Sequence, residues 1–225
     1  MSQNIIPILT IDGPSGVGKG TIARIMAQKK KWHLLDSGAI YRAFALIIDT
    51  REINIADEKA LRKIAETLDV KFKTKSGNKL VSIYLDGKDV SKILRTEKIG
   101  KIASKIASIE VVRSMLLKRQ KDFFKTPGLV ADGRDMGTTV FPDAPFKVYL
   151  TASVDERVNR RLKQLQAQGS EGIILNILSD VVNRDKRDYT RKYSPLKPAK
   201  DALIIDSTKL SINEVIIQVI ALVEA

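Results

Sequence analysis

A glycine-rich segment near the N-terminus has the composition and spacing of a phosphate-binding loop. It follows the pattern Gly-x4-Gly-Lys, which begins at Gly13 and ends at Lys19. Glycines let the backbone curl, so that successive N–H groups point inward and surround an anion. A lysine at this position brings a full positive charge to the β- and γ-phosphates of a nucleotide. The segment is therefore predicted to hold a donor nucleotide through Gly13, Pro14, Ser15, Gly16, Val17, Gly18, Lys19, Gly20 and Thr21.

One position of this loop departs from the general motif. Ser or Thr usually follows the lysine directly, where its hydroxyl binds Mg²⁺. Here Gly20 takes that place and Thr21 comes next. A Gly-Lys-Gly-Thr ending is similar to nucleoside monophosphate kinases rather than to GTPases or motor ATPases. The departure leaves open whether Thr21 contacts the metal directly or only a phosphate.

A second polar motif, Asp132-Gly-Arg-Asp135, directly follows the apolar run Leu129–Ala131. The carboxyl ends of parallel strands are where α/β proteins bind ligands. Asp132 is then placed to orient Mg²⁺ or its bound waters. Two simpler interpretations remain open, a turn capped by Asp132 and a surface ion pair between Arg134 and Asp135.

Arginines gather in the C-terminal third of the chain. Arg157, Arg160 and Arg161 have the spacing of one helix face, as do Arg184, Arg187, Asp188 and Arg191. Residues 168–172, Gln-Gly-Ser-Glu-Gly, read as a turn between the two helices. Such a pair of helices suits a lid that closes over phosphates. The alternative is a solvated helical hairpin with ion pairs inside each helix.

The residue types that are absent narrow the chemistry. The chain has no cysteine and one histidine, His33, which we interpret as a strand residue rather than a catalytic base. No His-Arg-Asp catalytic loop is present. An acceptor that is itself a phosphate needs no base, because its second pKa is about 6. Transfer between two phosphates requires instead positive charge, a metal ion and exclusion of water.

Short apolar strands that alternate with helices are predicted to position these groups. Pairing of the first strand, within Ile5–Ile11, should begin after Pro7, which cannot donate to a ladder. The other strands are expected within Leu129–Ala131, Phe146–Leu150 and Ala202–Ile205. This order predicts a parallel sheet with helices on both faces.

Helical periodicity marks the first and last helices. Ile22, Ile25 and Met26 form one stripe, and Trp32 is expected to pack beside it. The last helix has apolar residues at Ile212, Val215, Ile216, Val219, Ile220 and Val223. Ser211 with Glu214, and Ser153 with Glu156, have the capping-box spacing.

One region breaks the alternation of strands and helices. Val70–Lys73 and Val81–Leu85 alternate between apolar and polar residues, and residues 76–78, Ser-Gly-Asn, lie between them as a predicted turn. This pattern indicates a small antiparallel hairpin inserted in the α/β core.

Composition agrees with one soluble domain of 225 residues, since 44% are hydrophobic and 29% are charged. No apolar run reaches the roughly 20 residues that cross a bilayer, and the N-terminus lacks the features of a signal peptide. We therefore expect a cytoplasmic protein.

The formal charge of +13 indicates a polyanionic partner, but charge alone does not choose between nucleic acid and nucleotides. Aromatic residues, at 5%, do not interleave with the basic runs, which argues against base stacking on single strands.

Six stretches taken together resemble the bacterial cytidylate kinases, a family of P-loop nucleoside monophosphate kinases. They are the phosphate loop, Leu35-Asp-Ser-Gly-Ala-Ile-Tyr-Arg42, Asp86-Gly-Lys-Asp-Val-Ser91, Leu94-Arg-Thr96, Ala131-Asp-Gly-Arg-Asp-Met-Gly137, and residues 184–191. The resemblance covers nearly the whole chain and includes the predicted hairpin.

The resemblance implies a role for each matching residue. Ser104, Arg113 and Asp135 would contact cytosine, and Arg42, Arg134 and Arg191 would surround the acceptor phosphate. Asp188 would bind the sugar hydroxyls with Arg184 close by, and Ser37 and Tyr41 would line the same pocket. Catalysis would depend on Lys19, Asp132, Arg134 and Arg191, while Arg157 and Arg161 would contact ATP. Mg²⁺ would be held near Thr21 and Asp132, in the latter case through water.

The implied fold is an α/β P-loop kinase in a single domain, residues 1–225. Its core would comprise about residues 1–37, 97–155 and 193–225, with a monophosphate-binding insertion at 38–96 and a helical lid at 156–192. The implied reaction transfers the γ-phosphoryl group of ATP to CMP or dCMP, in a monomer that binds neither nucleic acid nor membrane.

A kinase for UMP or AMP remains the nearer alternative to this function. The other is a basic RNA-binding protein that uses ATP as a switch, although neither a basic tail nor an RNA-binding module is visible.

Overall fold

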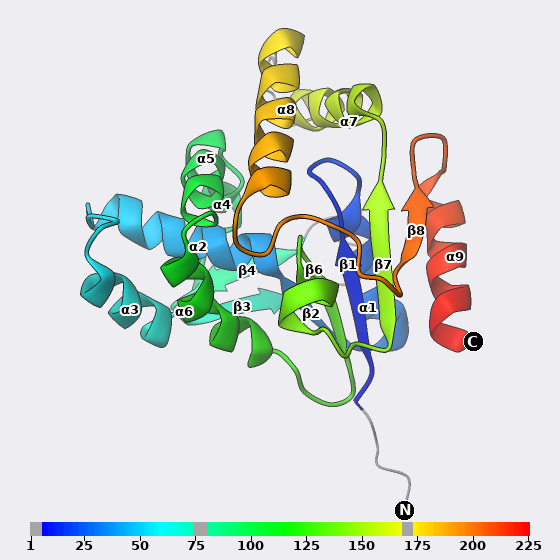
Figure 1. The fold of residues 1–225 in the computed structure, drawn as a ribbon, viewed down its shortest axis with the longest axis horizontal. Coiled ribbons are helices and arrows are strands. Elements are labelled where there is room, and N and C mark those ends of the chain that lie inside the picture. The colour runs from blue at the N-terminus through cyan, green and yellow to red at the C-terminus, as the bar shows by residue number, and fades with distance from the viewer. Residues whose placement is uncertain (1–5, 74–80, 168–172) are drawn as a thin grey trace, which may run out of the picture.

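A five-stranded parallel sheet forms the centre of the molecule (Figure 1). The computed structural model of the chain describes residues 6–73, 81–167 and 173–225. The strands are β1 (Ile8–Asp12), β2 (His33–Asp36), β6 (Leu129–Asp132), β7 (Phe146–Thr151) and β8 (Leu203–Asp206). They lie in the order β2-β6-β1-β7-β8, and all four neighbouring pairs are parallel. The predicted parallel sheet is therefore confirmed, and β1 begins directly after Pro7 as expected.

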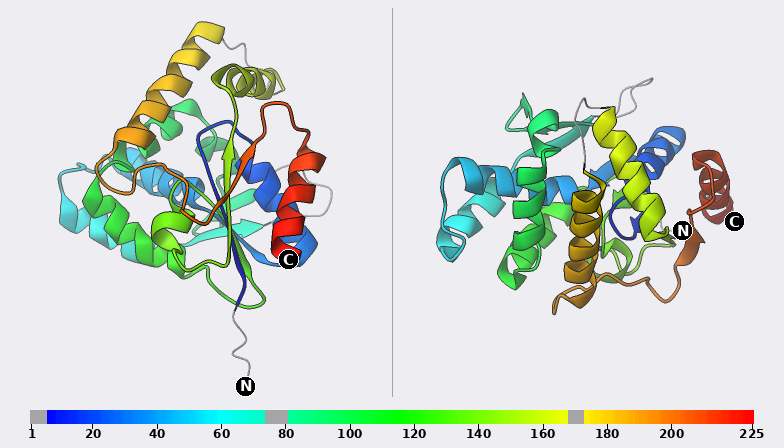
Figure 2. Two further views of the ribbon diagram at one scale, coloured as in Figure 1. Left: turned by 45° about the vertical axis from the view of Figure 1, so that its right-hand side comes forward. Right: turned by 90° about the horizontal axis from the view of Figure 1, so that it is seen from above.

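Apolar residues on both faces of the sheet explain why its strands read as nearly continuous apolar runs. Along β6, Leu129 and Ala131 contribute to one apolar cluster, while Val130 contributes to the other. Helices α1 (Lys19–Lys30) and α9 (Ile212–Glu224) cover the face of Val130. They lie side by side in Figure 2. Helices α2 (Ser37–Thr50) and α6 (Glu110–Lys121) cover the opposite face.

The apolar cluster on the face covered by α2 and α6 extends beyond the sheet into a helical half of the molecule. Helices α3 (Glu58–Thr67) and α5 (Glu97–Ile106) pack into it together with α2 and α6. A separate three-stranded antiparallel sheet joins them, made of β3 (Val70–Lys73), β4 (Ser82–Leu85) and β5 (Lys88–Asp89). The short helix α4 (Ser91–Leu94) follows β5. The register pairs Val70 with Leu85, which confirms the predicted hairpin, whereas its turn at residues 76–78 lies outside the described residues.

Helices α7 (Val154–Gln166) and α8 (Ile174–Thr190) lie beyond the carboxyl ends of β1 and β7 (Figure 1). They pack on each other through a small apolar cluster of Val158, Leu165, Ile177 and Val181. The predicted turn at residues 168–172 lies outside the described part of the chain. Two helices thus face the sheet edge at which ligands bind in α/β proteins.

The predicted helix ends are confirmed, with two qualifications. Ser211 and Glu214 form a reciprocal capping box on α9, whereas Ser153 only accepts from the backbone of Glu156, because the Glu156 carboxylate pairs with Arg160 instead. Ile212 is expected in the apolar stripe of α9 but is 53% exposed, and it takes no part in the apolar cluster that α9 joins. Trp32 packs against the apolar cluster beside α1 as predicted. Within the described residues, no helix is long and apolar enough to cross a membrane.

Candidate active site

One pocket of about 890 Å³ lies between the sheet edge and helices α5, α7 and α8. The predicted site residues line it with two exceptions, Gly13 and Pro14. The structure thus brings together the following predicted residues: Ser15, Gly16, Val17, Gly18, Lys19, Gly20, Thr21, Ser37, Tyr41, Arg42, Ser104, Arg113, Asp132, Arg134, Asp135, Arg157, Arg161, Arg184, Asp188 and Arg191.

Glycines of the phosphate loop are required by close approach and by backbone conformation. A Cβ at Gly13 would lie 2.0 Å from the carbonyl oxygen of Leu150, so any larger residue would separate the loop from β7. Gly18 has a φ of 97°, in the left-handed region that favours glycine, and is the N-cap of α1. Helix α1 then begins at Lys19, which directs its N-terminal backbone N–H groups into the pocket.

Lys19 is buried, and its ammonium group donates to the carbonyl oxygen of Pro14 at 2.8 Å. Pro14 therefore contributes to the site by orienting the lysine rather than by lining the pocket. The pKa of Lys19 is lowered to about 7, first by burial and then by the nearby charge of Arg134, while Asp132 opposes the shift. A phosphate bound in the pocket would place a negative charge beside Lys19 and would thereby favour its charged form.

Asp132 ends strand β6 and faces the start of α1. A Cβ built on Gly20 would lie 3.3 Å from Oδ2 of Asp132, so the carboxylate faces the position that the general motif gives to a hydroxyl. Its oxygens make no hydrogen bond within the described residues, which excludes the turn-capping interpretation there. Burial raises the pKa of Asp132 well above its usual range, and the charges of Asp36 and Asp12 add to this effect.

These carboxylates fit a Mg²⁺ ion that is held mainly by phosphates and water. No group of three or more His, Cys, Asp and Glu residues forms a metal cage in the described ranges. Mg²⁺ characteristically binds nucleotide phosphates with only one or two protein carboxylates and keeps several waters. Asp132 and Thr21 both line the pocket beside Lys19 and could contribute to such a site.

Asp12 is a structural support of the site that the sequence reasoning missed. Its two carboxylate oxygens accept hydrogen bonds from the backbone N–H groups of Met136 and Gly137, at 2.8 and 2.7 Å. The carboxylate at the end of β1 thereby fixes the segment that follows Asp135. Burial raises the pKa of Asp12 to about 6, against the two hydrogen bonds that lower it. Its position just before Gly13 was the only available signal.

Asp135 lies between two arginines of the pocket. It forms a buried salt bridge with Arg113, and the Arg191 guanidinium is 3.7 Å from its other oxygen. Arg134 instead pairs with Asp188 on α8, with Nε 2.9 Å from Oδ2. The suggested surface pair between Arg134 and Asp135 is therefore wrong, because the two neighbours turn to different partners inside the pocket.

Arginines of like charge crowd the region around Arg184. The pKa of Arg184 is lowered to about 9, first by burial and then by the charges of Arg134, Arg42 and Arg187, while Asp188 opposes the shift. The pKa of Arg42 is lowered in the same way, first by burial. Nε of Arg184 is buried and has no hydrogen-bond partner in the described residues. This crowding of positive charge marks the place where a bound anion would be stabilised most.

The end of α2 that faces the pocket is held by a residue that the sequence reasoning missed. The hydroxyl of Ser37 donates to Oε1 of Gln120, a buried residue of α6, at 2.6 Å. Burial raises the pKa of Tyr41 to about 12, so its hydroxyl stays protonated and can donate. The Arg113 guanidinium lies 5.6 Å from the centre of the Tyr41 ring. Nothing near Gln120 in the sequence signals its role, which depends on the packing of α6 against α2.

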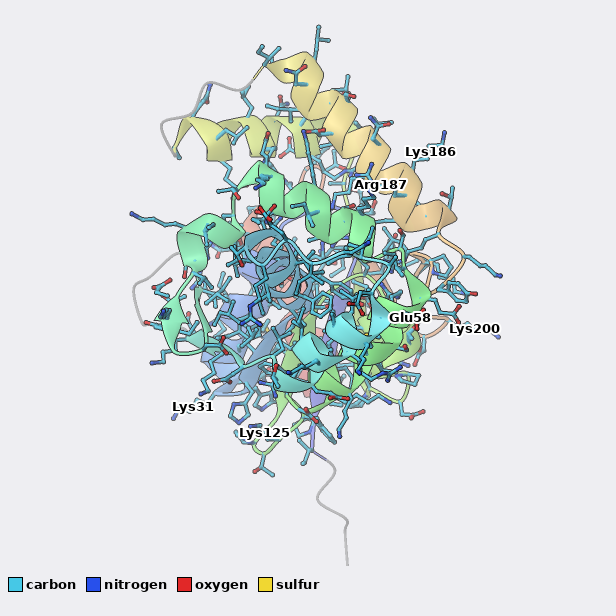
Figure 3. All side chains as sticks on the ribbon, turned by 90° about the vertical axis from the view of Figure 1, so that its left-hand side faces the viewer. Lys31, Glu58, Lys125, Lys186, Arg187 and Lys200 are labelled. Carbon is cyan, nitrogen blue, oxygen red and sulfur yellow. The ribbon has the colours of Figure 1, made fainter. Side chains whose placement is uncertain are left out.

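Ser104 on α5 is reached from α8 by Arg187. Nε of Arg187 is 3.3 Å from the Ser104 hydroxyl oxygen, and Figure 3 shows this arginine between the two helices, whereas Lys186 points outward. Arg187 was part of the predicted arginine face but not of the predicted substrate contacts. Arg191 departs from the predicted helix face, because α8 ends at Thr190 and Arg191 continues in an extended conformation.

On the donor side, Arg157 of α7 is buried against the phosphate loop. Its guanidinium donates to the carbonyl oxygens of Ala152 and Ser15, each at 3.2 Å, and pairs with Asp185 of α8 at 2.6 Å. Arg160 donates to the carbonyl oxygens of Val17 and Ser207 as well as to Glu156. The interpretation of a solvated hairpin is therefore wrong, because these arginines contact the loop and line the pocket.

Comparison with known proteins agrees with this arrangement. The family model described as cytidylate kinase matches residues 9–225. A protein of Colwellia psychrerythraea named cytidylate kinase is 51% identical over 214 residues, which cover 95% of this chain and 94% of the relative. Proteins of the same name from Aeromonas salmonicida and Sodalis glossinidius are each 50% identical, over 97% and 96% of this chain and 94% and 95% of their own lengths. Because the family model and these relatives span both the phosphate loop and the arginine-lined half of the pocket, this chain belongs to the cytidylate kinase family.

Proposed function

We propose that the protein transfers the γ-phosphoryl group of ATP to CMP or dCMP, giving ADP and CDP or dCDP. The observation that carries this proposal is that one pocket contains both a phosphate loop with a buried lysine and a second group of arginines and carboxylates. Relatives named cytidylate kinase over nearly their whole length support the choice of a cytidine nucleotide as acceptor.

The donor would lie along the phosphate loop. Loop amides and Lys19 would hold the β- and γ-phosphates, with Arg157 and Arg161 on the side of α7. Thr21 and Asp132 would hold Mg²⁺, Asp132 through water, and the bound ion would neutralise charge on the transferred phosphoryl group. The proposed geometry leaves Lys19 free to exchange its bond to Pro14 for a bond to phosphate.

The acceptor would lie against the arginine-rich side of the pocket. Arg42, Arg134 and Arg191 would surround its phosphate, because planar guanidinium groups match phosphate oxygens with two parallel hydrogen bonds. Asp188 would bind the sugar hydroxyls, with Arg184 close by. Ser104, Arg113 and Asp135 would contact the base, since a carboxylate accepts from the exocyclic amine of cytosine. Ser37 and Tyr41 would complete this side of the pocket.

The reaction itself needs no protein base. An oxygen of the acceptor phosphate forms the new bond to the γ-phosphorus, and the bond from that phosphorus to the β–γ bridging oxygen breaks, so that ADP leaves. The acceptor phosphate is mostly ionised at neutral pH, because its second pKa is about 6. Catalysis by Lys19, Arg134, Arg191 and Asp132 would consist of positioning the two phosphates and stabilising the charge between them.

We also propose the division of labour that the sequence suggested, with an insertion at about residues 38–96, a lid at about 156–192 and a core formed by the rest. The packing of α7 on α8 beside the pocket supports a lid. We further propose that the protein acts as a monomer.

A panel of acceptors tests the function directly. The value of kcat/KM for ATP-dependent phosphorylation is measured with CMP, dCMP, UMP, AMP and GMP under the same conditions. We expect CMP and dCMP to exceed the other acceptors by at least tenfold, because uracil lacks the exocyclic amine that cytosine offers to Asp135 next to Arg113, and the two-ring bases adenine and guanine are larger than cytosine. A preference for UMP, AMP or GMP would contradict the proposal.

A further inference from the structure

The ion pair between Arg157 and Asp185 links the donor side of the pocket to helix α8. Nη2 of Arg157 lies 2.6 Å from Oδ2 of Asp185, and the two side chains are only 5% and 13% exposed. Arg157 belongs to α7 and Asp185 to α8, so the pair joins the two helices beside their apolar cluster. A pair this buried is held much more firmly than a surface ion pair.

The guanidinium of Arg157 is fixed on three sides. Besides Asp185, it donates through Nε to the carbonyl oxygen of Ala152 and through Nη1 to that of Ser15, in the phosphate loop. A guanidinium has five N–H donors, so two remain for a ligand. A Cβ at Gly16 would lie 3.2 Å from Cβ of Arg157, which shows how closely the arginine stem approaches the loop.

In the described residues Asp185 forms no second hydrogen bond or ion pair, and beyond Arg157 its charge also acts on Arg134. The other oxygen of Asp185, Oδ1, is buried and accepts no hydrogen bond in the part of the chain that the structure describes. The effect of removing this carboxylate should therefore fall mainly on Arg157. Three residues further along α8, Asp188 pairs with Arg134 on the acceptor side. One helix thus carries two carboxylates, each of which holds an arginine of a different half of the pocket.

We propose that Asp185 is a positioning residue, which holds Arg157 over the phosphate loop and ties this donor contact to the helix that carries the acceptor contacts. The inference rests on the proposed function, because it takes ATP as the ligand of the loop. Asp185 does not touch the nucleotide itself. Its carboxylate keeps the guanidinium in the orientation in which the two remaining N–H groups meet donor phosphate.

The sign of the effect separates positioning from simple charge. Asp185 is a negative charge close to a site for a polyanion, so its removal should tighten ATP binding if only Coulomb repulsion mattered. If Asp185 positions Arg157, its removal should have the opposite effect. Without the carboxylate, the Arg157 guanidinium loses its orientation and ATP binds more weakly. Hydrogen bonds to charged groups are among the stronger ones, so we expect the dissociation constant of ATP to rise about tenfold.

The test compares Asp185→Ala with Asp180→Ala. Asp180 is on the same helix and pairs with Lys101 at 3.4 Å, but it makes no contact with Arg157. The dissociation constant of ATP is measured by calorimetry, and KM for ATP and for CMP by steady-state assay. We expect the ATP values to rise about tenfold for Asp185→Ala, with a smaller change in KM for CMP because the charge of Asp185 also acts on Arg134. All three values should change less than twofold for Asp180→Ala. Asp185→Asn, of nearly the same shape, is the second variant if Asp185→Ala does not fold.

A double mutant shows whether the effect passes through Arg157. In the Arg157→Ala background, adding Asp185→Ala should change the ATP dissociation constant less than twofold. Independent losses that multiply, or tighter ATP binding by Asp185→Ala alone, would overturn the inference. The function stands or falls separately, because wild-type protein that binds ATP without phosphorylating CMP would disprove the function, while the ATP-binding data would still decide the role of Asp185.

Discussion

Lys19 lies among groups that pull its proton in opposite directions. Burial and Arg134 favour the neutral amine, while Asp132 and Asp12 favour the ammonium. With a pKa near 7, the lysine of the free protein is close to half charged at neutral pH and mostly neutral at pH 8. The phosphates of a donor would restore its charge, because an opposite charge at contact distance favours the charged form.

ATP binding without Mg²⁺ should therefore take up a proton at pH 8. The sign follows from Lys19, which is mostly neutral before binding and charged afterwards, so uptake should decrease toward pH 6, where the lysine is already protonated. Calorimetry in two buffers of different ionisation enthalpy measures the number of protons. Lys19→Met should abolish the uptake and reduce kcat by orders of magnitude, with CMP affinity largely kept. Uptake unchanged in this variant would show that another group titrates.

Asp135 is the residue on which base preference should depend. Uracil has a carbonyl oxygen at the position where cytosine has its amine. In Asp135→Asn the side-chain amide can donate a hydrogen bond to this oxygen of uracil. We therefore expect the ratio of kcat/KM for CMP over UMP to fall at least tenfold, through loss with CMP more than with UMP. The acceptor assay measures both, and thermal unfolding checks the fold, because the substitution also weakens the buried pair with Arg113. Equal losses for the two acceptors would show that Asp135 does not contact the base.

Residues that contact phosphate could be predicted from the sequence, because glycine, lysine and arginine at fixed spacing carry their own chemistry. Lys19, Asp132 and Arg134 all lie in the pocket as expected. The supporting residues Asp12 and Gln120 could not be predicted. Their roles depend on backbone N–H groups and hydroxyls that are 83 to 125 positions away in the chain, and only the fold brings these groups together.

The sequence predicts where most strands of the central sheet lie, but not how exposed each residue of an element is. Four strands of the central sheet are apolar runs whose positions follow from composition, whereas no range is predicted for β2, of which only His33 is expected in a strand. Ile212 shows the limit of periodicity, because it has the spacing of the apolar stripe and is nevertheless 53% exposed. Strand order is likewise invisible in the chain, since β6 pairs with β1 across more than a hundred residues.

Helices α7 and α8 should become more protected when both substrate sites are filled. They pack on each other through only four buried apolar residues and otherwise reach the rest of the molecule through polar pairs, such as Lys101 with Asp180. Such elements open at low cost. We expect amide exchange in both helices to slow on addition of ADP with CMP, and to change little in α9, which packs on the sheet. Equal exchange of α7 and α8 with and without ligands would contradict the proposed lid.

Part of the high positive charge of the whole molecule lies where the proposed substrates bind. Among the described residues, eleven arginines and two lysines line the pocket, against seven carboxylates. Exposed lysines such as Lys31, Lys186 and Lys200 lie on different parts of the surface (Figure 3). A concave site of one sign concentrates the field more than scattered surface charge does. The lining of the pocket therefore accounts for part of the formal charge of +13.

Concentrated charge should lower the stability of the ligand-free protein, and Arg184 is the place to measure this effect. Its pKa of about 9 means that burial and neighbouring arginines disfavour the charged form. Asp188, its nearest opposite charge, also has Arg134 as a partner and would not be left alone. Arg184→Met should therefore raise the free energy of unfolding by about 1 kcal/mol in urea titrations without nucleotide.

The same substitution should weaken CMP binding at least tenfold, because a guanidinium next to the sugar and phosphate is lost. Lys186→Met, two residues away and pointing to solvent, is the matched control and should change stability by less than about 0.5 kcal/mol. Arg184→Met raises the free energy of unfolding and weakens CMP binding only if the arginines repel each other in the ligand-free protein and are neutralised by a bound anion. Loss of stability in Arg184→Met would instead assign this arginine to the packing of α8, and the proposed binding of the acceptor phosphate would rest on Arg42, Arg134 and Arg191.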